Sequence, residues 1–285
     1  AEAEGILSGS VGEHDPYKSY NYEDRIGGTR SNSVQVRRVI EVPDDFATIQ
    51  TAINNASNGD VIQVKPKIYS ESIVVNKTIS LIGDDRDTTI IDGEGRVILV
   101  TADNVLISGF TVRNGEVGVW LNSSGKTIVT DNNVNKNDDG IHLFSSQNCL
   151  ISKNNASGNH HRGIFLNDSL NCTVSRNIAS YNGWYGINLN SSRNCIVDGN
   201  EAESNDWDGI GLYSSENCVI HGNNLKNTTW YGIWLDSSNN NIIYHNNFLH
   251  NYIQVSSVTS SNNWDNNGEG NYWSNYAEQD LTEDG

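Results

Sequence analysis

A seven-residue pattern, Gly-(Val/Ile)-x-Leu-x-(Ser/Asp)-Ser, occurs six times in this chain. The first step between copies is 22 residues, the next four are 23, and the copies begin at Gly118, Gly140, Gly163, Gly186, Gly209 and Gly232. A fixed period of this length, with short apolar runs between Asn, Gly and Ser, indicates a solenoid of stacked coils. Equivalent residues on successive coils then lie roughly 4.8 Å apart. A functional site must therefore be sought down the columns of equivalent residues.

These columns assign the apolar residues and the cysteines to the interior. Positions one and three after the repeat Gly are Val/Ile and Leu, and the position between them points outward, as in a strand. The cysteines share one column at 23-residue spacing: Cys149, Cys172, Cys195 and Cys218. Because in-register Cβ atoms lie slightly farther apart than the ~3.5–4.5 Å of a relaxed disulfide, we expect buried free thiols. A metal site in this column is the alternative, but it requires ligands that converge.

Two columns of Asn are expected to fix the corners of each coil. We expect their amides to hydrogen-bond to the coils above and below. One column comprises Asn148, Asn171, Asn194, Asn217 and Asn240, and the other comprises Asn132, Asn154, Asn177, Asn200, Asn223 and Asn246. The repeat Gly is expected where a tight or left-handed turn begins.

The domain organisation follows from where the period starts and ends. Residues 1–38 lack an apolar period and are expected to form a flexible arm, although residues 34–36 and 39–42 are apolar enough to supply a first strand. Apolar residues at helical spacing predict a capping helix near residues 46–56, with Asp44 or Asp45 as its N-cap. We expect the solenoid to occupy residues 39–255 and a C-terminal cap to occupy residues 256–285.

Composition narrows the class of protein. The net charge is −17 and no basic stripe follows the repeats, so we expect no nucleic-acid partner. No apolar run is long enough to span a membrane. The chain starts at Ala1 and contains no Met, which predicts a secreted or cell-surface protein whose signal peptide has been removed. Asn-X-Ser/Thr sequons arise either by chance in such a repeat or as glycosylation sites, with candidates at Asn76, Asn122, Asn167, Asn190 and Asn227.

Several segments resemble a known repeat family. The run Ser192-Arg-Asn-Cys-Ile-Val-Asp-Gly-Asn200 and the Gly-Ile-x-Leu-x-Ser-Ser strand are similar to repeats of the NosD-like, carbohydrate-binding and sugar hydrolase (CASH) family. The opening from Pro43 to Ile53 resembles the start of pectinesterase-like proteins, and residues 270–276 resemble a segment of archaeal surface proteins. The resemblance covers roughly residues 40–255 and implies an all-β fold, a right-handed single-stranded parallel β-helix with a short N-terminal capping helix.

The same resemblance leaves the function open, because the family spans lyases, glycosidases, epimerases, metal-site assembly factors and surface proteins. The copper-related role of NosD would imply thioether, thiol or imidazole ligands. The chain has no Met and its cysteines are expected to be buried, so we predict no cofactor or metal site. Calcium is kept as the alternative, since the related surface proteins continue into a calcium-loop-like stretch.

The residues just before each repeat Gly vary from coil to coil, which makes this turn the candidate site. Aromatic rings beside carboxylates are a common platform for sugars. We take as candidate carbohydrate-binding residues Trp184, Tyr185, Asp206, Trp207, Asp208, Trp230 and Tyr231. The outward position two after Gly adjoins them, with Trp120, His142, Phe165 and Trp234. Alternatively, the rings pack on one another only to protect the coil edge.

Asp138, Asp139 and His161 are the candidate catalytic residues. Asp139 and His161 lie on consecutive coils and resemble part of the Asp-Asp and His constellation of polygalacturonase-type enzymes. The third carboxylate and the later basic residue of that constellation have no match. Asp208 lies roughly 10–14 Å farther along the axis, which is too far to pair with Asp139. An Asp before Gly is also common in turns for conformational reasons.

Three functions are compatible with these features. The first is binding of an extracellular polysaccharide or cell-surface glycan through the Trp/Tyr/Asp turn column. The second is a structural subunit of a filament or surface layer, assembled end to end through the solenoid ends and the N-terminal arm. The third is a polysaccharide-cleaving glycosidase or lyase.

Overall fold

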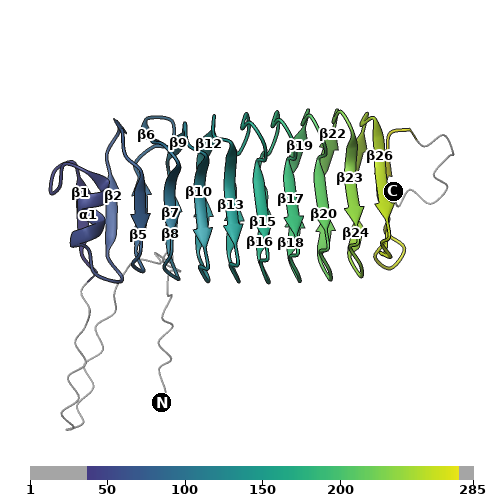
Figure 1. Cartoon of the computed structure of the whole chain (residues 1–285), viewed down its shortest axis with the longest axis horizontal. Helices are drawn as coiled ribbons and strands as arrows, with labels where there is room; N and C mark the ends of the chain where they lie inside the picture. Colours follow the sequence, from purple (N-terminus) through teal and green to yellow (C-terminus); the bar gives the residue numbers. More distant parts are fainter. Residues whose placement is uncertain (1–36, 276–285) are drawn as a thin grey trace, which may run out of the picture. The chain divides into compact units, whose positions relative to one another are not determined.

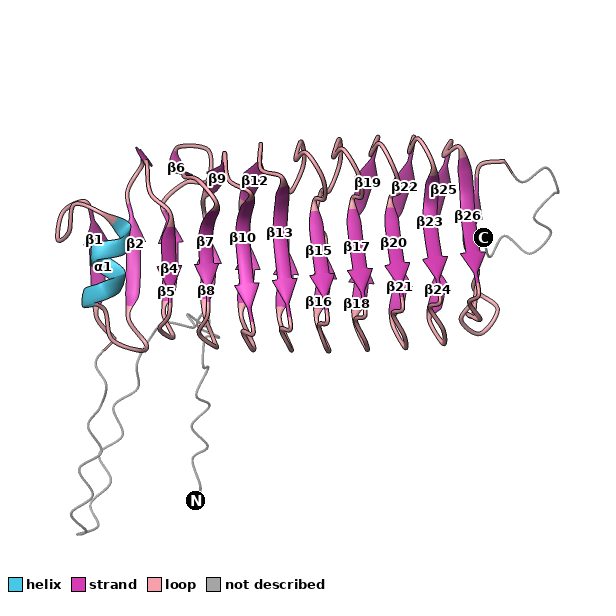
Figure 2. Ribbon diagram, viewed as in Figure 1, coloured by secondary structure: helices cyan, strands magenta, loops and turns pink. Residues whose placement is uncertain are grey.

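The computed structural model describes residues 37–275, in which parallel strands stack coil upon coil (Figure 1). The expected arm of residues 1–38 therefore lies almost entirely outside the described residues, as does the end of the expected C-terminal cap. Figure 2 shows that strands make up nearly all of the regular structure, with one short helix at the N-terminal end of the stack. The fold class predicted from the repeat, an all-β parallel β-helix, is confirmed.

Each coil contributes strands to three sides. One side is a ten-stranded sheet of β1 (Val39–Val42), β2 (Val61–Val64), β5 (Ser80–Gly83), β8 (Leu106–Ser108), β11 (Ile128–Thr130), β14 (Leu150–Ser152), β16 (Thr173–Ser175), β18 (Ile196–Asp198), β21 (Val219–His221) and β24 (Ile242–Tyr244). The second is a nine-stranded sheet of β4 (Ile73–Val75), β7 (Arg96–Val100), β10 (Val117–Asn122), β13 (Asp139–Phe144), β15 (Ile164–Asn167), β17 (Ile187–Asn190), β20 (Ile210–Tyr213), β23 (Tyr231–Asp236) and β26 (Ile253–Val258).

The third side consists of two four-stranded sheets. They are β3 (Lys67–Tyr69), β6 (Thr89–Asp92), β9 (Thr111–Arg113) and β12 (Asn133–Asn135), then β19 (Glu201–Glu203), β22 (Asn224–Lys226), β25 (Asn247–Leu249) and β27 (Tyr272–Trp273). Single bridges through Asn155 and Ile178 join the two sheets. Pairing continues past residue 255, where we expected the β-helix to end, because β26 reaches Val258 and β27 pairs with β25.

The register of the nine-stranded sheet is that of the sequence repeat. Ile141 pairs with Ile164, and Ile164 pairs with Ile187, so equivalent residues do become neighbours. The Ile and Leu columns are fully buried, and the four cysteines are free thiols buried in the same core. The prediction of a ladder of buried thiols is thus confirmed.

Asparagine ladders hold the corners, but not both of the expected columns form one. From Asn132 to Asn271, each side-chain amide donates to the next Asn Oδ1 at 2.9–3.1 Å. The column that begins at Asn148 is exposed instead, with φ between 53° and 58°, a left-handed conformation that Asn tolerates. Its amides form only one link within the described residues, from Asn171 Nδ2 to Asn148 Oδ1 at 3.4 Å, so the prediction of a continuous ladder in this column is wrong. An unexpected second ladder runs through Asn137, Asn159, Asn182 and Asn205.

The repeat Gly is required for space rather than for a left-handed φ. A Cβ on Gly163 would lie 2.7 Å from the carbonyl oxygens of Ala156 and Gly186 and 2.8 Å from Asn182 Nδ2. Such distances are too short for any side chain. The glycines with positive φ lie elsewhere in the coils, for example at Gly158 and Gly222.

The capping helix α1 (Ile49–Asn55) buries Ile49, Ala52 and Ile53 against the first coils. Its N-cap is Thr48, whose hydroxyl accepts from the Thr51 N–H, and not Asp44 or Asp45 as expected. Those carboxylates are used elsewhere, since Asp45 accepts from the Glu41 N–H and Asp44 pairs with Lys65. Across residues 37–275, no helix is long and apolar enough to cross a membrane.

Candidate functional site

Each coil enters the nine-stranded sheet through a turn that stacks on the equivalent turns. The backbone N–H groups of Trp184, Trp207 and Trp230 each donate to the carbonyl one coil earlier, at 2.7–3.1 Å. The second Asn ladder lies immediately before this turn and fixes it. As a result the His161 and Trp184 rings stack with centroids 4.1 Å apart, and Trp184 and Trp207 stack at 5.5 Å.

The outward position two after Gly is more covered than expected. Trp120 stacks on His142 with centroids 5.3 Å apart, and His142 packs on Phe165 at 4.5 Å. The Arg96 guanidinium lies 3.5 Å from the Trp120 ring centroid, and that of Arg162 lies 4.2 Å from Phe165. Burial, together with these two arginines, lowers the pKa of His142 to about 4. These rings are therefore half-buried or buried, not an open platform.

On later coils the outward position two after the repeat Gly is occupied by Asn188 and then by Gly211. A gap opens between the side chains of this column at Gly211. The Tyr185 ring occupies the space above it, since a Cβ on Gly211 would lie 3.0 Å from Tyr185 Cε1. Tyr185 is 5% exposed, and its hydroxyl shares a 2.8 Å hydrogen bond with that of Tyr213. Gly211 has no side chain, and the next outward residue is the large Trp234, so a hollow lies between the Tyr185 and Trp234 rings.

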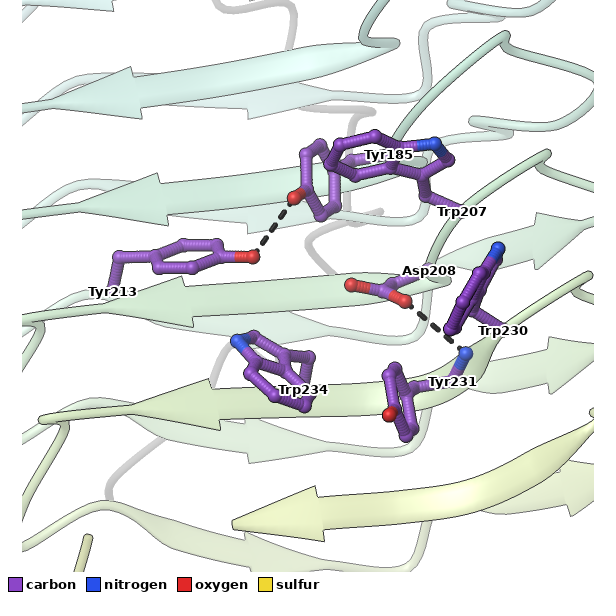
Figure 3. A pocket seen from close by; sticks show the side chains of 7 residues that line it. All are labelled: Tyr185, Trp207, Asp208, Tyr213, Trp230, Tyr231 and Trp234. Carbon is purple, nitrogen blue, oxygen red and sulfur yellow. Dashed lines mark hydrogen bonds between the residues drawn. The ribbon is translucent and has the colours of Figure 1, made fainter. Parts of the chain in front are cut away.

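This hollow is a pocket of about 340 Å³ over β20 and β23. Figure 3 shows six aromatic rings around one carboxylate, from Tyr185, Trp207, Asp208, Tyr213, Trp230, Tyr231 and Trp234. Trp207 and Trp230 form its exposed rim, at 45% and 50% exposure. Asp208 is only 4% exposed, and its Oδ1 accepts the Tyr231 N–H at 3.1 Å. Burial raises the pKa of Asp208 to about 7.

Five of the seven candidate carbohydrate-binding residues line this pocket, and two do not. Trp184 belongs to the ring stack beside it, and Asp206 is exposed near His160 and Tyr181 in a separate depression. The sequence interpretation missed Tyr213 and did not assign Trp234 to the site. The signal that could have found them is the change from Phe165 to Asn188 to Gly211 down the outward column, which marks where space opens.

The candidate catalytic residues do not form one constellation. Asp139 pairs with Arg162, whose Nη1 lies 3.1 Å from Oδ2, while burial raises the pKa of Asp139. Asp138 lies 3.5 Å from His160 Nδ1. His161 stacks on Trp184, and no side-chain hydrogen bond within the described residues joins it to either carboxylate. Each acid therefore has its own partner.

The candidate glycosylation sites differ in accessibility. Asn76 and Asn227 are exposed, whereas the other three are half-buried on the outward face of the nine-stranded sheet: Asn122, Asn167 and Asn190. Glycosylation at any of them stays a prediction.

The donor groups in residues 37–275 do not form a copper site. Each buried thiol donates to a backbone carbonyl, as Cys149 does to Ser124 O at 3.3 Å. Hydrogen bonding within the column, with burial, raises the pKa of the Cys149 thiol and opposes the thiolate form that binds metal, whereas the hydrogen bond with Cys195 lowers the pKa of Cys218. No group of three His, Cys, Asp or Glu side chains in the described part of the chain could hold a metal ion, and the sequence has no Met.

Solved structures share the fold at low sequence identity. The A-module of the mannuronan C-5 epimerase of Azotobacter vinelandii aligns at a TM-score of 0.64 and 16% identity, over 78% of this chain and 70% of the module. An alginate lyase from Paenibacillus sp. aligns at 0.56 and 15%, over 78% of this chain and 99% of the lyase. The Dettilon tailspike protein aligns at 0.61 and 15% over 74% of this chain, which spans only 50% of the tailspike.

At these identities the likeness establishes the parallel β-helix fold alone. Among curated proteins, no sequence matches. A family model with the description "Periplasmic copper-binding protein (NosD)" does match, over residues 53–278. This match extends over most of the chain and includes every residue of the pocket. The chain therefore belongs to the NosD family.

Proposed function

We propose that this protein binds a polysaccharide outside the cytoplasm, through the pocket over β20 and the Trp column beside it. The observation that carries the proposal is the convergence of six aromatic rings and one buried carboxylate in a single pocket. Sugar rings pack on aromatic faces, and the exposed Trp207 and Trp230 offer such faces at the rim. Successive coils add roughly 4.8 Å each, so the stacked turns suit an extended ligand.

Two of the structures with this fold are named for enzymes of polysaccharides, mannuronan and alginate, and the NosD family is described as periplasmic. Both facts support a glycan partner outside the cytoplasm. The charge of this chain narrows the choice of glycan. A net charge of −17 repels polyanions, so we expect a neutral or positively charged polysaccharide.

Cleavage of the polysaccharide is a weaker proposal. Asp139 would have to act while paired with Arg162, and His161 makes no side-chain hydrogen bond to it in the described structure. End-to-end assembly of solenoids also stays a prediction, because the structure describes a single copy of the chain.

Binding to immobilised glycans tests the proposed function. We expect Trp207→Ala and Trp230→Ala each to weaken binding by about two- to tenfold, if a ring stacked on a sugar contributes as much as one stacked on another ring, roughly 0.5–1.5 kcal/mol. The control is Tyr272→Ala, which removes another exposed ring that lies outside the pocket, at 52% exposure. Equal binding by all three variants and the unchanged protein would refute the proposal.

A further inference from the structure

Asp208 is a buried carboxylate without a positively charged partner. Its column also contains Asp139, which is buried to a similar degree but pairs with Arg162 at 3.1 Å. Within residues 37–275, Asp208 forms no ion pair with Lys, Arg or His, and a backbone N–H is its hydrogen-bond donor. A charge in such a place is costly unless a ligand compensates for it. The contrast between the two coils indicates that the missing cation comes from outside residues 37–275.

The rings around Asp208 are arranged to surround a ligand. Tyr185 meets Trp207 and Tyr213 edge to face, at 78° and 82°, while Tyr231 and Trp234 are tilted by 43° with centroids 4.8 Å apart. Trp120 and His142, in contrast, are parallel within 2° and cover each other. Figure 3 shows the rings of the pocket around the carboxylate of Asp208. Their faces carry the negative part of the ring quadrupole, which attracts cations.

Part of the hydrogen-bonding capacity of the pocket is already used within the chain. The Tyr185 and Tyr213 hydroxyls bond to each other, and Asp208 Oδ1 already accepts from Tyr231. The indole Nε1 of Trp234 is buried without a partner, so it is available to one acceptor oxygen. A hydroxyl is satisfied by hydrogen bonds alone, whereas an ammonium group is also attracted by ring faces and by an anion, and the pocket supplies both.

We propose that the pocket over β20 binds an organic ammonium group, with Asp208 as its counter-ion and the Trp and Tyr rings as its walls. An oxygen of the ligand, close to its ammonium nitrogen, accepts a hydrogen bond from Trp234 Nε1. The inference rests on the proposed function for the source of this group, which is an amino sugar of the bound polysaccharide. A free quaternary ammonium compound has the same chemistry and is the other source that the experiment must distinguish.

Calorimetric titration of the full chain with choline and with 3,3-dimethyl-1-butanol tests the cation chemistry. The second compound has the shape of choline with carbon in place of the charged nitrogen. We expect choline to bind at least about tenfold more tightly, and Asp208→Asn to abolish that difference. Asp168→Asn is the matched control, because it removes one negative charge at an exposed turn and should keep the difference. Equal binding of the two compounds would overturn the inference.

Titration with oligomers of glucosamine and of N-acetylglucosamine identifies the source. Tighter binding of the glucosamine oligomer, lost in Asp208→Asn, supports the amino sugar. Binding of choline without either oligomer supports the ammonium site with a free ligand, and it counts against the proposed function. Binding of the N-acetylated oligomer with no response to choline or glucosamine overturns the ammonium site and leaves the proposed function standing.

Discussion

Replacement of Asp208 by Asn should stabilise the folded protein at neutral and higher pH. The side chain is 4% exposed and has no cationic partner within the described residues, so its ionised form destabilises the folded state. Asn has nearly the same shape, and its Oδ1 can still accept the Tyr231 N–H. The substitution therefore removes the buried charge and leaves the packing of the pocket unchanged.

The magnitude follows from the pKa of Asp208, which burial raises from 3.8 to about 7. Between these values the folded state binds more protons than the unfolded state, so the free energy of unfolding falls as pH rises. Each pKa unit corresponds to about 1.4 kcal/mol, which gives a cost on the order of 4 kcal/mol above pH 7. The Asn variant avoids this cost, so its advantage should grow from near zero below pH 4 to its full size above pH 7.

Urea unfolding of both proteins at pH 4, 6 and 8 measures this difference. Asp139→Asn is the comparison variant: burial raises the pKa of Asp139 too, but this substitution leaves the Arg162 guanidinium without its partner at 3.1 Å, so the variant should be less stable at pH 8 than Asp208→Asn. An Asp208→Asn variant that is no more stable than the unchanged protein at pH 8 would show that the buried carboxylate is already compensated within the chain.

Three further predictions concern the Asn ladder at Asn200, the pocket wall at Gly211 and the charge of Asp208. Asn200→Ala removes an amide that donates to Val174 O and Asn223 Oδ1, both at 2.9 Å. We therefore expect urea unfolding to show a free energy of unfolding lower by roughly 2–4 kcal/mol. A change below about 0.5 kcal/mol would contradict a structural role for Asn200. Gly211→Ala places a methyl group 3.0 Å from Tyr185 Cε1 and should weaken choline binding while circular dichroism is unchanged; unaltered affinity would show that Gly211 does not shape the pocket. Choline binding should weaken as pH falls below about 7, because Asp208 becomes protonated while Tyr185 and Tyr213, whose pKa values are raised by burial, stay neutral; a constant affinity from pH 5 to 8 would exclude Asp208 as counter-ion.

The repeat predicts most of the fold because its period determines which residues become neighbours. The pairing of Ile141 with Ile164, the buried thiols and one Asn ladder all follow from the spacing of 23. The failure at Asn148 has a local cause. A column of identical residues forms a ladder only where the side chain points into the corner of the coil. Asn148 is exposed and instead occupies a position of positive φ, a conformation that Asn tolerates.

The pocket was less predictable, because it depends on side chains that differ between coils. The turn column included Trp207, Asp208 and Trp230, which line the pocket, and their role in binding stays a prediction. It could not show that the Arg162 guanidinium covers the Phe165 ring on the outward face of the nine-stranded sheet. Nor could it show that the same face stays open two coils later, at Gly211. These outcomes are set by the sizes and charges of neighbours one or two coils apart, which the repeat itself does not encode.

A crystal structure of the protein with a bound glucosamine oligosaccharide tests the central claim most directly. Our account predicts that one sugar lies between Trp207, Trp230 and Trp234, with its amino nitrogen beside the Asp208 carboxylate. A sugar found on another face of the coils, or a pocket that stays empty while the oligosaccharide is bound elsewhere, would contradict it.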